Sequence, residues 1–225
     1  MQVADCFAHL AARWRDELVV CALGSASREW YAATRSDRAF YMLSSMGLAS
    51  SFGLGLALGL PTQRVWVFDG DGGLCLNLST LLTEASQQPP NLVHFVLANR
   101  VYQVLARHPL GNAARTDFAA LARGAGIARV YTFRELADFR REIDGILDTP
   151  GFAFVPSKAA AGLFEPRDRS FKRFRSRRPP ADMLQSRLRA FGQHKIVVEE
   201  IAPASQIDRL PLAGGFGHPH HIGEK

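Results

Sequence analysis

The stretch that decides the fold is Val65-Trp66-Val67-Phe68-Asp69-Gly70-Asp71-Gly72-Gly73, in which a short apolar run leads into a turn of glycine and aspartate. Such a run, bounded by turn residues, is typical of a buried strand in a parallel sheet. Ligands of open parallel sheets collect outside the carboxyl ends of the strands. The stretch therefore predicts a sheet strand and, at its end, a site that contains Asp71.

Short apolar runs and helical patterns alternate over residues 19–155. The expected strands are residues 19–23, 65–68, 92–98, 128–132 and 152–155. The expected helices are residues 46–60, 77–87, 116–125 (with Thr116 as the N-cap) and 134–147. Alternating strands and helices predict an α/β fold, a three-layer αβα domain around a central, mainly parallel sheet.

The formal charge of +6 is distributed unevenly along the 225 residues. Residues 1–155 contain 14 Arg and 14 acidic residues, whereas residues 156–225 contain 13 Lys and Arg against 7 acidic residues. Residues 164–180, FEPRDRSFKRFRSRRPP, are too charged and too interrupted by proline to form a core. We therefore expect one domain over residues 1–155 and an irregular, partly disordered basic extension over residues 156–225, with one helix over 182–191 and one strand over 195–201.

Several protein classes are excluded by composition. Cys6, Cys21 and Cys75 are far apart and form no CxxC pair, which argues against a disulfide framework or a zinc cluster and favours a reducing cytoplasm. The charged N-terminus lacks the apolar core of a signal peptide. The apolar run 46–60 is shorter than the roughly 20 residues that a bilayer requires, so we expect no membrane association.

Asp71 and Asn99 each follow an expected strand, which places both at the same edge of the sheet. Carboxylate and carboxamide oxygens suit a hard cation such as Mg²⁺, to which Val101 can add a backbone carbonyl. Glycines beside them allow the backbone to approach a diphosphate closely: Gly70, Gly72 and Gly73. Taken alone, an acid after such a turn can equally well cap the next helix.

A second segment, FYMLSSMGLASS at residues 40–51, leads into the expected helix 46–60. Ser45 and Gly47 at a helix start are expected to direct free N–H groups at an anion. Together with the strand ends at Asp71 and Asn99, three segments then converge on one anion and metal site.

The GDG turn followed by Asn99 resembles the fingerprint of thiamine-diphosphate enzymes, and residues 19–155 resemble their diphosphate-binding (PP) domain. The run FYMLSSMGLASSFGLGLALGLP is most similar to sulfopyruvate decarboxylase beta subunits and phosphonopyruvate decarboxylases. The resemblance implies that Asp71, Asn99 and the Val101 carbonyl bind Mg²⁺, and that Met46 supports the bent cofactor. The other implied cofactor contacts are Ser45, Gly47, Gly70, Gly72, Gly73 and Tyr102.

The sequence also departs from that family at several positions. Ser44 stands where glycine is usual, Gly73 where serine is frequent, and Ala98 where an acid or amide commonly precedes the ligand Asn. After Tyr102 the chain reads VLARH at residues 104–108 in place of a glycine-rich TGGQ-like loop. Beyond Val155 we find no match. The ligands are retained, and the identity of the substrate is left open.

The resemblance implies a decarboxylase of a small anionic 2-oxo acid, such as sulfopyruvate or phosphonopyruvate. In this superfamily the activating Glu belongs to a pyrimidine-binding domain, and this chain has room for only one α/β layer. We therefore expect a partner subunit of the alpha type in a hetero-oligomer. Glu29 and Glu84 are expected on helix surfaces. Candidate substrate contacts are Arg100, Arg107 and His108, with His108 a candidate proton donor.

Other reactive side chains are expected to have structural roles. Cys21 and Cys75 are expected to be buried, and His94 to be a core or interface group. Trp66, Phe68 and Phe95 are expected in the core, and His218, His220 and His221 are not expected to form a designed metal site.

Three alternatives to this decarboxylase stay open. The chain can belong to another thiamine-diphosphate enzyme of the acetolactate-synthase type, or bind the cofactor without catalysing. A less favoured alternative is a nucleic-acid or polyanion binder that acts through basic residues interleaved with Phe171 and Phe174. Those basic residues are Lys172, Arg173, Arg175, Arg177 and Arg178.

Overall fold

A computed structural model describes residues 1–36 and 38–158 of the chain. Several expectations concern residues outside this part: the basic segment 164–180, the helix over 182–191, the strand over 195–201, and His218, His220 and His221. They stay predictions.

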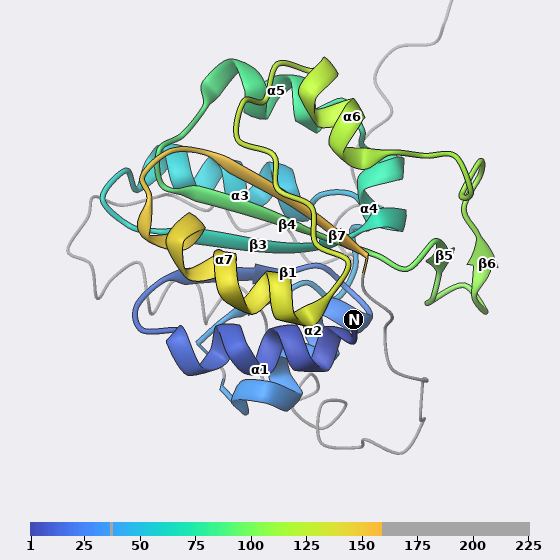
Figure 1. The fold of residues 1–225 in the computed structure, drawn as a ribbon, viewed down its shortest axis with the longest axis horizontal. Coiled ribbons are helices and arrows are strands. Elements are labelled where there is room, and N and C mark those ends of the chain that lie inside the picture. Colours follow the sequence, from blue (N-terminus) through green and yellow to red (C-terminus); the bar gives the residue numbers. More distant parts are fainter. Residues whose placement is uncertain (37, 159–225) are drawn as a thin grey trace, which may run out of the picture. The chain divides into compact units, whose positions relative to one another are not determined.

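The described chain alternates strands and helices from β1 onward (Figure 1). Its elements are, in order, α1 (Val3–Arg13), β1 (Leu18–Cys21), α2 (Ser25–Thr34), β2 (Phe40–Tyr41), α3 (Ala49–Gly59), β3 (Val65–Gly70), α4 (Asp71–Leu76), α5 (Thr80–Gln87), β4 (Leu92–Ala98), β5 (Val101–Tyr102), β6 (His108–Pro109), α6 (Phe118–Gly124), α7 (Leu136–Asp148) and β7 (Ala153–Lys158).

Five strands form one sheet in the order β2-β1-β3-β4-β7, and each neighbouring pair is parallel. β5 and β6 form a separate antiparallel hairpin. β3 and β4 lie in the middle of the sheet, and all seven residues of β4 are buried. This explains why both read as unbroken apolar runs, because a central parallel strand is covered on both faces.

Helices cover the sheet on both sides. Figure 1 shows α3, α5 and α6 on one side and α1, α2 and α7 on the other. The aromatic side chains expected in the core are there: Trp66, Phe68 and Phe95 are 1%, 0% and 3% exposed. The three-layer αβα architecture and the mainly parallel sheet are thus confirmed.

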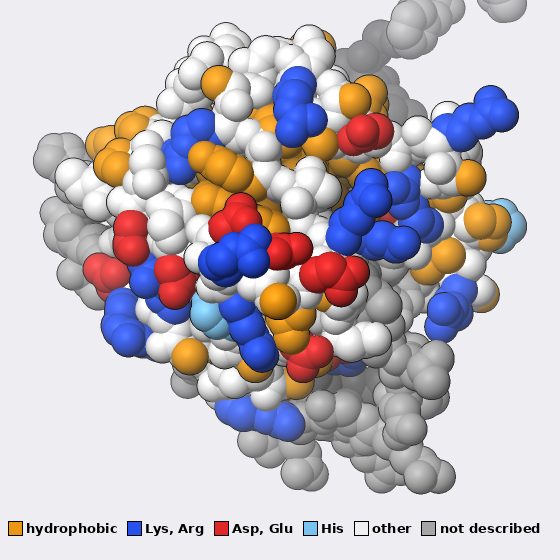
Figure 2. Space-filling view, in the orientation of Figure 1, with side chains coloured by type: hydrophobic (Ala, Val, Ile, Leu, Met, Phe, Trp, Pro, Cys, Tyr) orange, Lys and Arg blue, Asp and Glu red, His pale blue; other side chains and the backbone are white. Residues whose placement is uncertain are grey.

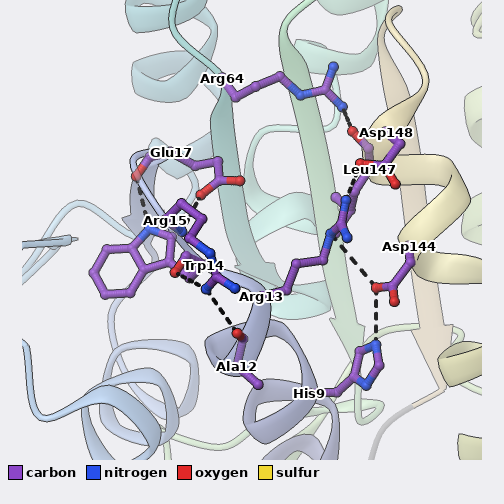
Figure 3. A network of polar contacts seen from close by, with 10 residues as sticks. All are labelled: His9, Ala12, Arg13, Trp14, Arg15, Glu17, Arg64, Asp144, Leu147 and Asp148. Carbon is purple, nitrogen blue, oxygen red and sulfur yellow. Dashed lines mark hydrogen bonds and ion pairs between the residues drawn. The ribbon is translucent and has the colours of Figure 1, made fainter.

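A polar network joins α1 to α7 on the outside of one helical layer (Figure 3). His9 Nε2 lies 3.1 Å from Asp144 Oδ1, and the Arg13 guanidinium pairs with Asp148 and approaches Asp144. Basic and acidic side chains are interspersed over the face that Figure 2 shows, so charges of opposite sign lie near one another there.

Three local expectations were wrong. Residues 128–132 form no strand, since only Val130 pairs with Phe154 of β7 and the neighbouring residues are partly exposed. The N-cap of α6 is Asp117 rather than Thr116, because Asp117 Oδ1 accepts hydrogen bonds from the N–H groups of Ala119 and Ala120. Cys75 lies on the outer side of the short helix α4 and is exposed, whereas Cys21 is buried as expected.

Other boundaries shifted. Sequence reasoning assigned no element to residues 3–13, 25–34 or 40–41, where the structure has α1, α2 and β2. β7 continues to Lys158, three residues beyond the expected strand end. Among the described helices, none combines the length and the apolar character that a bilayer crossing requires.

Candidate functional site

A cleft of about 50 Å³ lies at the carboxyl ends of β1, β3 and β4. Nine of the predicted site residues line it: Met46, Gly47, Gly70, Asp71, Gly72, Gly73, Asn99, Val101 and Tyr102. The β1–α2 junction and the start of the hairpin complete the wall with Ala22, Leu23, Ser25, Asp69, Gln103 and Val104. The parallel topology thus gathers segments that are far apart in the sequence.

Asp71 is one of two buried carboxylates that line this cleft, with 1% of its surface exposed. It is the first residue of α4, and its oxygens accept hydrogen bonds from the N–H groups of Gly72 at 3.0 Å and of Arg100 at 2.6 Å. Burial raises the pKa of Asp71 to about 6, although these backbone donors favour the charged form. The Arg100 charge also lowers the pKa, but the effect of burial is larger, and no described side chain forms an ion pair with this carboxylate.

Asn99 directly follows β4 and lines the same cleft as Asp71. Its Oδ1 accepts a 3.0 Å hydrogen bond from the Val101 N–H, and its Nδ2 donates to Gln103 Oε1 at 3.2 Å. These bonds fix the side chain at the entry to the β5–β6 hairpin. A carboxamide oxygen keeps a second lone pair beyond the one that Val101 uses, so Oδ1 is able to bind a cation as well.

The segment before α3 forms a loop and not a helix start, which corrects the expectation for Ser45 and Gly47. Their φ angles are +64° and +90°, and α3 begins only at Ala49. Asn77 Nδ2 donates to the Gly47 carbonyl at 3.0 Å and ties the loop to the region after α4. A Cβ at Gly47 would lie 3.2 Å from the Gly73 carbonyl oxygen, so the loop and the glycine turn are in close contact. Met46 lines the cleft; Ser45 is exposed and does not.

Glu84 is not on a helix surface. It is 0% exposed, and both of its carboxylate oxygens lie close to His94 Nδ1, at 3.0 and 3.1 Å. The expectation was wrong because the inward side of α5 carries an acid that pairs with a histidine of the sheet. His94 is a buried core group, as expected. Glu29 is partly exposed on α2 and pairs with Arg28 at 3.0 Å.

The candidate substrate contacts do not contribute side chains to the wall of the cleft. The Arg100 guanidinium donates to the carbonyls of Ala113 and Thr116, each at 2.6 Å, and so secures the loop before α6. Arg107 and His108 are exposed on the hairpin, where His108 pairs with Tyr102 of β5. None of the three lines the cleft.

Sequence reasoning did not select Asp69 or the β1–α2 junction as parts of the site. Asp69 is 0% exposed and lines the cleft two residues before Asp71. Gly24 lies between β1 and α2, and Ser25 is the first residue of α2, as Asp71 is the first residue of α4 after β3. A signal was therefore present at Gly24, whose φ of +93° requires glycine.

The donor set fits a hard cation with an anionic ligand. Among residues 1–36 and 38–158, no Arg, Lys or His forms an ion pair with Asp71, and no group of three or more His, Cys, Asp or Glu side chains is placed to hold a metal. One carboxylate with amide and carbonyl oxygens is typical of Mg²⁺ sites, in which phosphate and water complete the coordination. The missing Cβ atoms at Gly72 and Gly73 let the Tyr102 ring and the Asp69 carboxylate pack directly against this turn, and so bring these side chains of the cleft close to its backbone.

A larger groove of about 770 Å³ lies between α5 and α6. Its walls are mainly apolar, with Leu78, Leu82 and Leu121, and its one carboxylate, Asp117, caps α6. It offers no converging set of ligands, so we place the functional site at the strand ends.

Known proteins match the same part of the chain. The family described as "Thiamine pyrophosphate enzyme, C-terminal TPP binding domain" matches residues 22–156. The sulfopyruvate decarboxylase subunit beta of Methanothermobacter thermautotrophicus is 45% identical over 143 residues, which cover 64% of this chain and 75% of that protein. The phosphonopyruvate decarboxylase of Streptomyces viridochromogenes is 37% identical over 141 residues, which cover 63% of this chain and 35% of that protein.

A solved structure shows the same fold at low sequence identity. The thiamine diphosphate-dependent 4-hydroxybenzoylformate decarboxylase of Rhodococcus jostii RHA1 superposes with a TM-score of 0.56 and 18% identity, over 72% of this chain and 33% of that one. The family match spans more than half of the chain and includes every residue that lines the cleft. The chain therefore belongs to the family of C-terminal thiamine pyrophosphate-binding domains of thiamine pyrophosphate enzymes.

Proposed function

We propose that this chain binds thiamine diphosphate through a Mg²⁺ ion held by Asp71, Asn99 and the Val101 carbonyl, as the diphosphate-binding subunit of a 2-oxo-acid decarboxylase. The observation that carries the proposal is Asp71 itself: a carboxylate that is 1% exposed, fixed by two backbone N–H groups, and without an ion pair among the described residues. A buried charge of this kind is costly unless a cation compensates it.

The residues of the cleft would hold the diphosphate end of the cofactor. Gly72 and Gly73 would allow the oxygens of the diphosphate to approach the backbone, and Met46 would support the cofactor from the loop before α3. When bound, thiamine diphosphate supplies the electron sink that decarboxylation of a 2-oxo acid requires. The role of this chain is to orient the cofactor and to keep water away from the metal ligands.

We propose further that a pyrimidine-domain subunit of the alpha type covers this cleft. A volume of about 50 Å³ is far below the roughly 300–1,000 Å³ of a complete small-molecule pocket. Four large apolar side chains beside the cleft are exposed: Leu48 at 48%, Leu76 at 57%, Val104 at 46% and Leu105 at 58%. Exposed apolar groups around a partial cleft favour a protein interface. We expect the assembly in the reducing cytoplasm, since the three cysteines are unpaired.

The proposed substrate is a small 2-oxo acid with a second anionic group, such as sulfopyruvate or phosphonopyruvate. Support comes from the names of the relatives, which are sulfopyruvate and phosphonopyruvate decarboxylases. Arg107 and His108 are exposed on the hairpin. We assign neither of them to catalysis within this chain alone.

Calorimetric titration with thiamine diphosphate tests the proposal, with Mg²⁺ or with EDTA, for the wild-type chain and for Asp71→Ala. We expect Mg²⁺-dependent binding that is weak for the chain alone and tighter with the partner subunit, and that Asp71→Ala abolishes. Binding that is indifferent to both EDTA and Asp71→Ala would refute the metal site. Full decarboxylase activity of the purified chain alone would refute the split between subunits.

A further inference from the structure

Behind the cleft, three ionisable side chains form a buried row that the proposed binding role does not use. Glu84 of α5, His94 of β4 and Asp69 of β3 are each 0% exposed. His94 Nδ1 lies 3.0 Å from Glu84 Oε1, and His94 Nε2 lies 4.0 Å from Asp69 Oδ2. The row thus leads from the helix that covers the sheet to the turn that carries Asp71.

The last member of the row is in contact with the glycine turn. Asp69 Oδ1 accepts a 2.8 Å hydrogen bond from the Gly70 N–H, and the same oxygen occupies the place where a Cβ at Gly73 would lie. Asp69 also lines the cleft. Its carboxylate therefore supports residues 70–73 from below, directly beside the proposed metal ligand.

His94 is placed to balance these two carboxylates. Its ring packs edge-on against Phe154 of β7, with centroids 5.1 Å apart, which fixes the direction of both nitrogens. In the described part of the chain, neither carboxylate pairs with Lys or Arg. Burial alone would lower the pKa of His94, but the carboxylates of Glu84 and Asp69 raise it above the ordinary value.

We propose that His94 is a positioning residue: held by Glu84, it fixes Asp69 and through it the 70–73 turn, and so sets how tightly that turn binds the magnesium–diphosphate group. Asp69 Oδ2 accepts no hydrogen bond from any described residue, so the facing imidazole is its principal partner. Without that partner, Asp69 is free to leave the Gly70 N–H and turn toward the cleft. The expected effect on cofactor affinity rests on the proposed function, whereas the expected effect on the conformation of the 70–73 turn does not.

Two substitutions of His94 distinguish the role of its Nδ1 from that of its Nε2. His94→Asn retains a donor near the position of Nδ1 and so keeps the contact with Glu84, whereas His94→Gln retains a donor near the position of Nε2 and so keeps the contact with Asp69. Leu92→Ala is the matched control, because Leu92 is a 0% exposed residue of the same strand at the end away from the cleft. It removes packing and leaves the row intact.

The first measurement is hydrogen exchange of the Gly70 amide in the cofactor-free chain. Loss of a hydrogen bond to a charged group corresponds to about tenfold faster exchange in His94→Asn, with His94→Gln within about threefold of wild type. Leu92→Ala is expected to change Gly70 exchange only as far as it lowers the free energy of unfolding. Equal Gly70 exchange in the Asn and Gln variants would overturn the proposal.

The second measurement is the affinity for thiamine diphosphate in saturating Mg²⁺, with the partner subunit present. We expect about tenfold weaker binding for His94→Asn and partial recovery in His94→Gln. If the loss of cofactor affinity is proportional to the loss of unfolding free energy in His94→Asn, His94→Gln and Leu92→Ala alike, His94 has only a structural role and the proposal fails. If the wild-type complex binds no cofactor, the proposed function fails, and Gly70 exchange still decides whether His94 positions the turn.

Discussion

The backbone N–H of Arg100 donates a 2.6 Å hydrogen bond to Asp71 Oδ2, so the chain that leaves β4 fixes the carboxylate at the end of β3. The φ of Arg100 is +67°, an uncommon value for a residue with a side chain, and it is part of the turn that presents this N–H. Two neighbouring strands are thereby joined at the proposed metal ligand. The carboxylate is held in one orientation before any ligand arrives.

Asp71→Asn should separate ligand binding from folding. The raised pKa of Asp71, about 6, means that the buried charge costs on the order of 2–3 kcal/mol at pH 7, which a neutral amide relieves. The amide nitrogen must, however, face one of the two N–H donors, which costs about 1.5–3 kcal/mol. We expect the free energy of unfolding from urea denaturation to stay within about 1 kcal/mol of wild type, while Mg²⁺-dependent cofactor binding falls at least about 100-fold.

Asp138→Asn is the matched control for that change, because Asp138 is an exposed carboxylate of α7. It should leave cofactor affinity unchanged. Retained binding by Asp71→Asn would show that this carboxylate is not a metal ligand.

The pH dependence of cofactor binding and of stability should have opposite signs. Mg²⁺ requires ionised Asp71, so affinity should fall by up to about tenfold per pH unit below pH 6. For folding, the pKa of Asp71 is about 6 in the native chain against an ordinary value of 3.8, so the native state binds more protons between these values. The contribution of Asp71 to the stability of the cofactor-free chain is therefore greatest below pH 3.8 and is lost as pH rises through 6.

Urea denaturation measures stability, and calorimetric titration measures cofactor affinity, from pH 4 to pH 8. For each quantity, the difference between wild type and Asp71→Asn gives the contribution of Asp71. Taking the difference removes the titration of other carboxyl groups. Asp69 has the same sign, with a pKa that burial also raises to about 6. An affinity that stays constant between pH 7 and pH 5 would contradict the assignment.

Two glycines of α3 should respond to alanine in opposite directions. A Cβ at Gly53 would overlap Val67 Cγ2 of β3, so Gly53→Ala should lower the free energy of unfolding by about 1–3 kcal/mol. Gly55 has no neighbour within 4 Å of its would-be Cβ and is exposed, so Gly55→Ala should raise it by roughly 0.5–1 kcal/mol. Thermal and urea unfolding measure both. Similar effects for the two variants would mean that helix propensity, not packing of α3 against the sheet, governs this helix.

Truncation after Lys158 tests the polyanion-binding alternative. The cut must follow Lys158 rather than Val155, because β7 pairs with β4 as far as Lys158. We expect cofactor affinity to be retained, since all residues that line the cleft precede the cut. Loss of a salt-sensitive affinity for a single-stranded oligonucleotide, measured by fluorescence anisotropy at several salt concentrations, would support the alternative.

The sequence predicted an element or a site correctly where a local pattern is compatible with one structure. The apolar run that became β4 was predicted residue for residue, because a strand covered on both faces is built mainly from apolar side chains. The cleft was predicted through Asp71 and Asn99, because strand ends in a parallel sheet meet at one edge. Both predictions needed only local pattern and topology.

Expectations failed where tertiary partners decide the environment. Glu84 follows the usual pattern of a surface acid, and only His94 on the strand below explains its burial. α1 was not predicted, although Val3, Cys6, Phe7 and Leu10 form one buried stripe, because polar and charged residues interrupt its apolar pattern in the sequence. Ser45 lies in a loop before α3, because its φ of +64° is not a helical value and the helix begins only at Ala49. The burial of such side chains depends on contacts between segments that are distant in the sequence.

Gly24 is held to glycine for two independent reasons. Its φ is +93°, and a Cβ there would lie 2.7 Å from Val104 Cγ1 of the hairpin segment. In evolutionary terms, a smaller residue at position 104 would remove the clash with a Cβ at position 24, but the positive φ would still disfavour any residue other than glycine there. A smaller residue at position 104 therefore does not open position 24 to substitution, which requires that the β1–α2 turn be rebuilt as well.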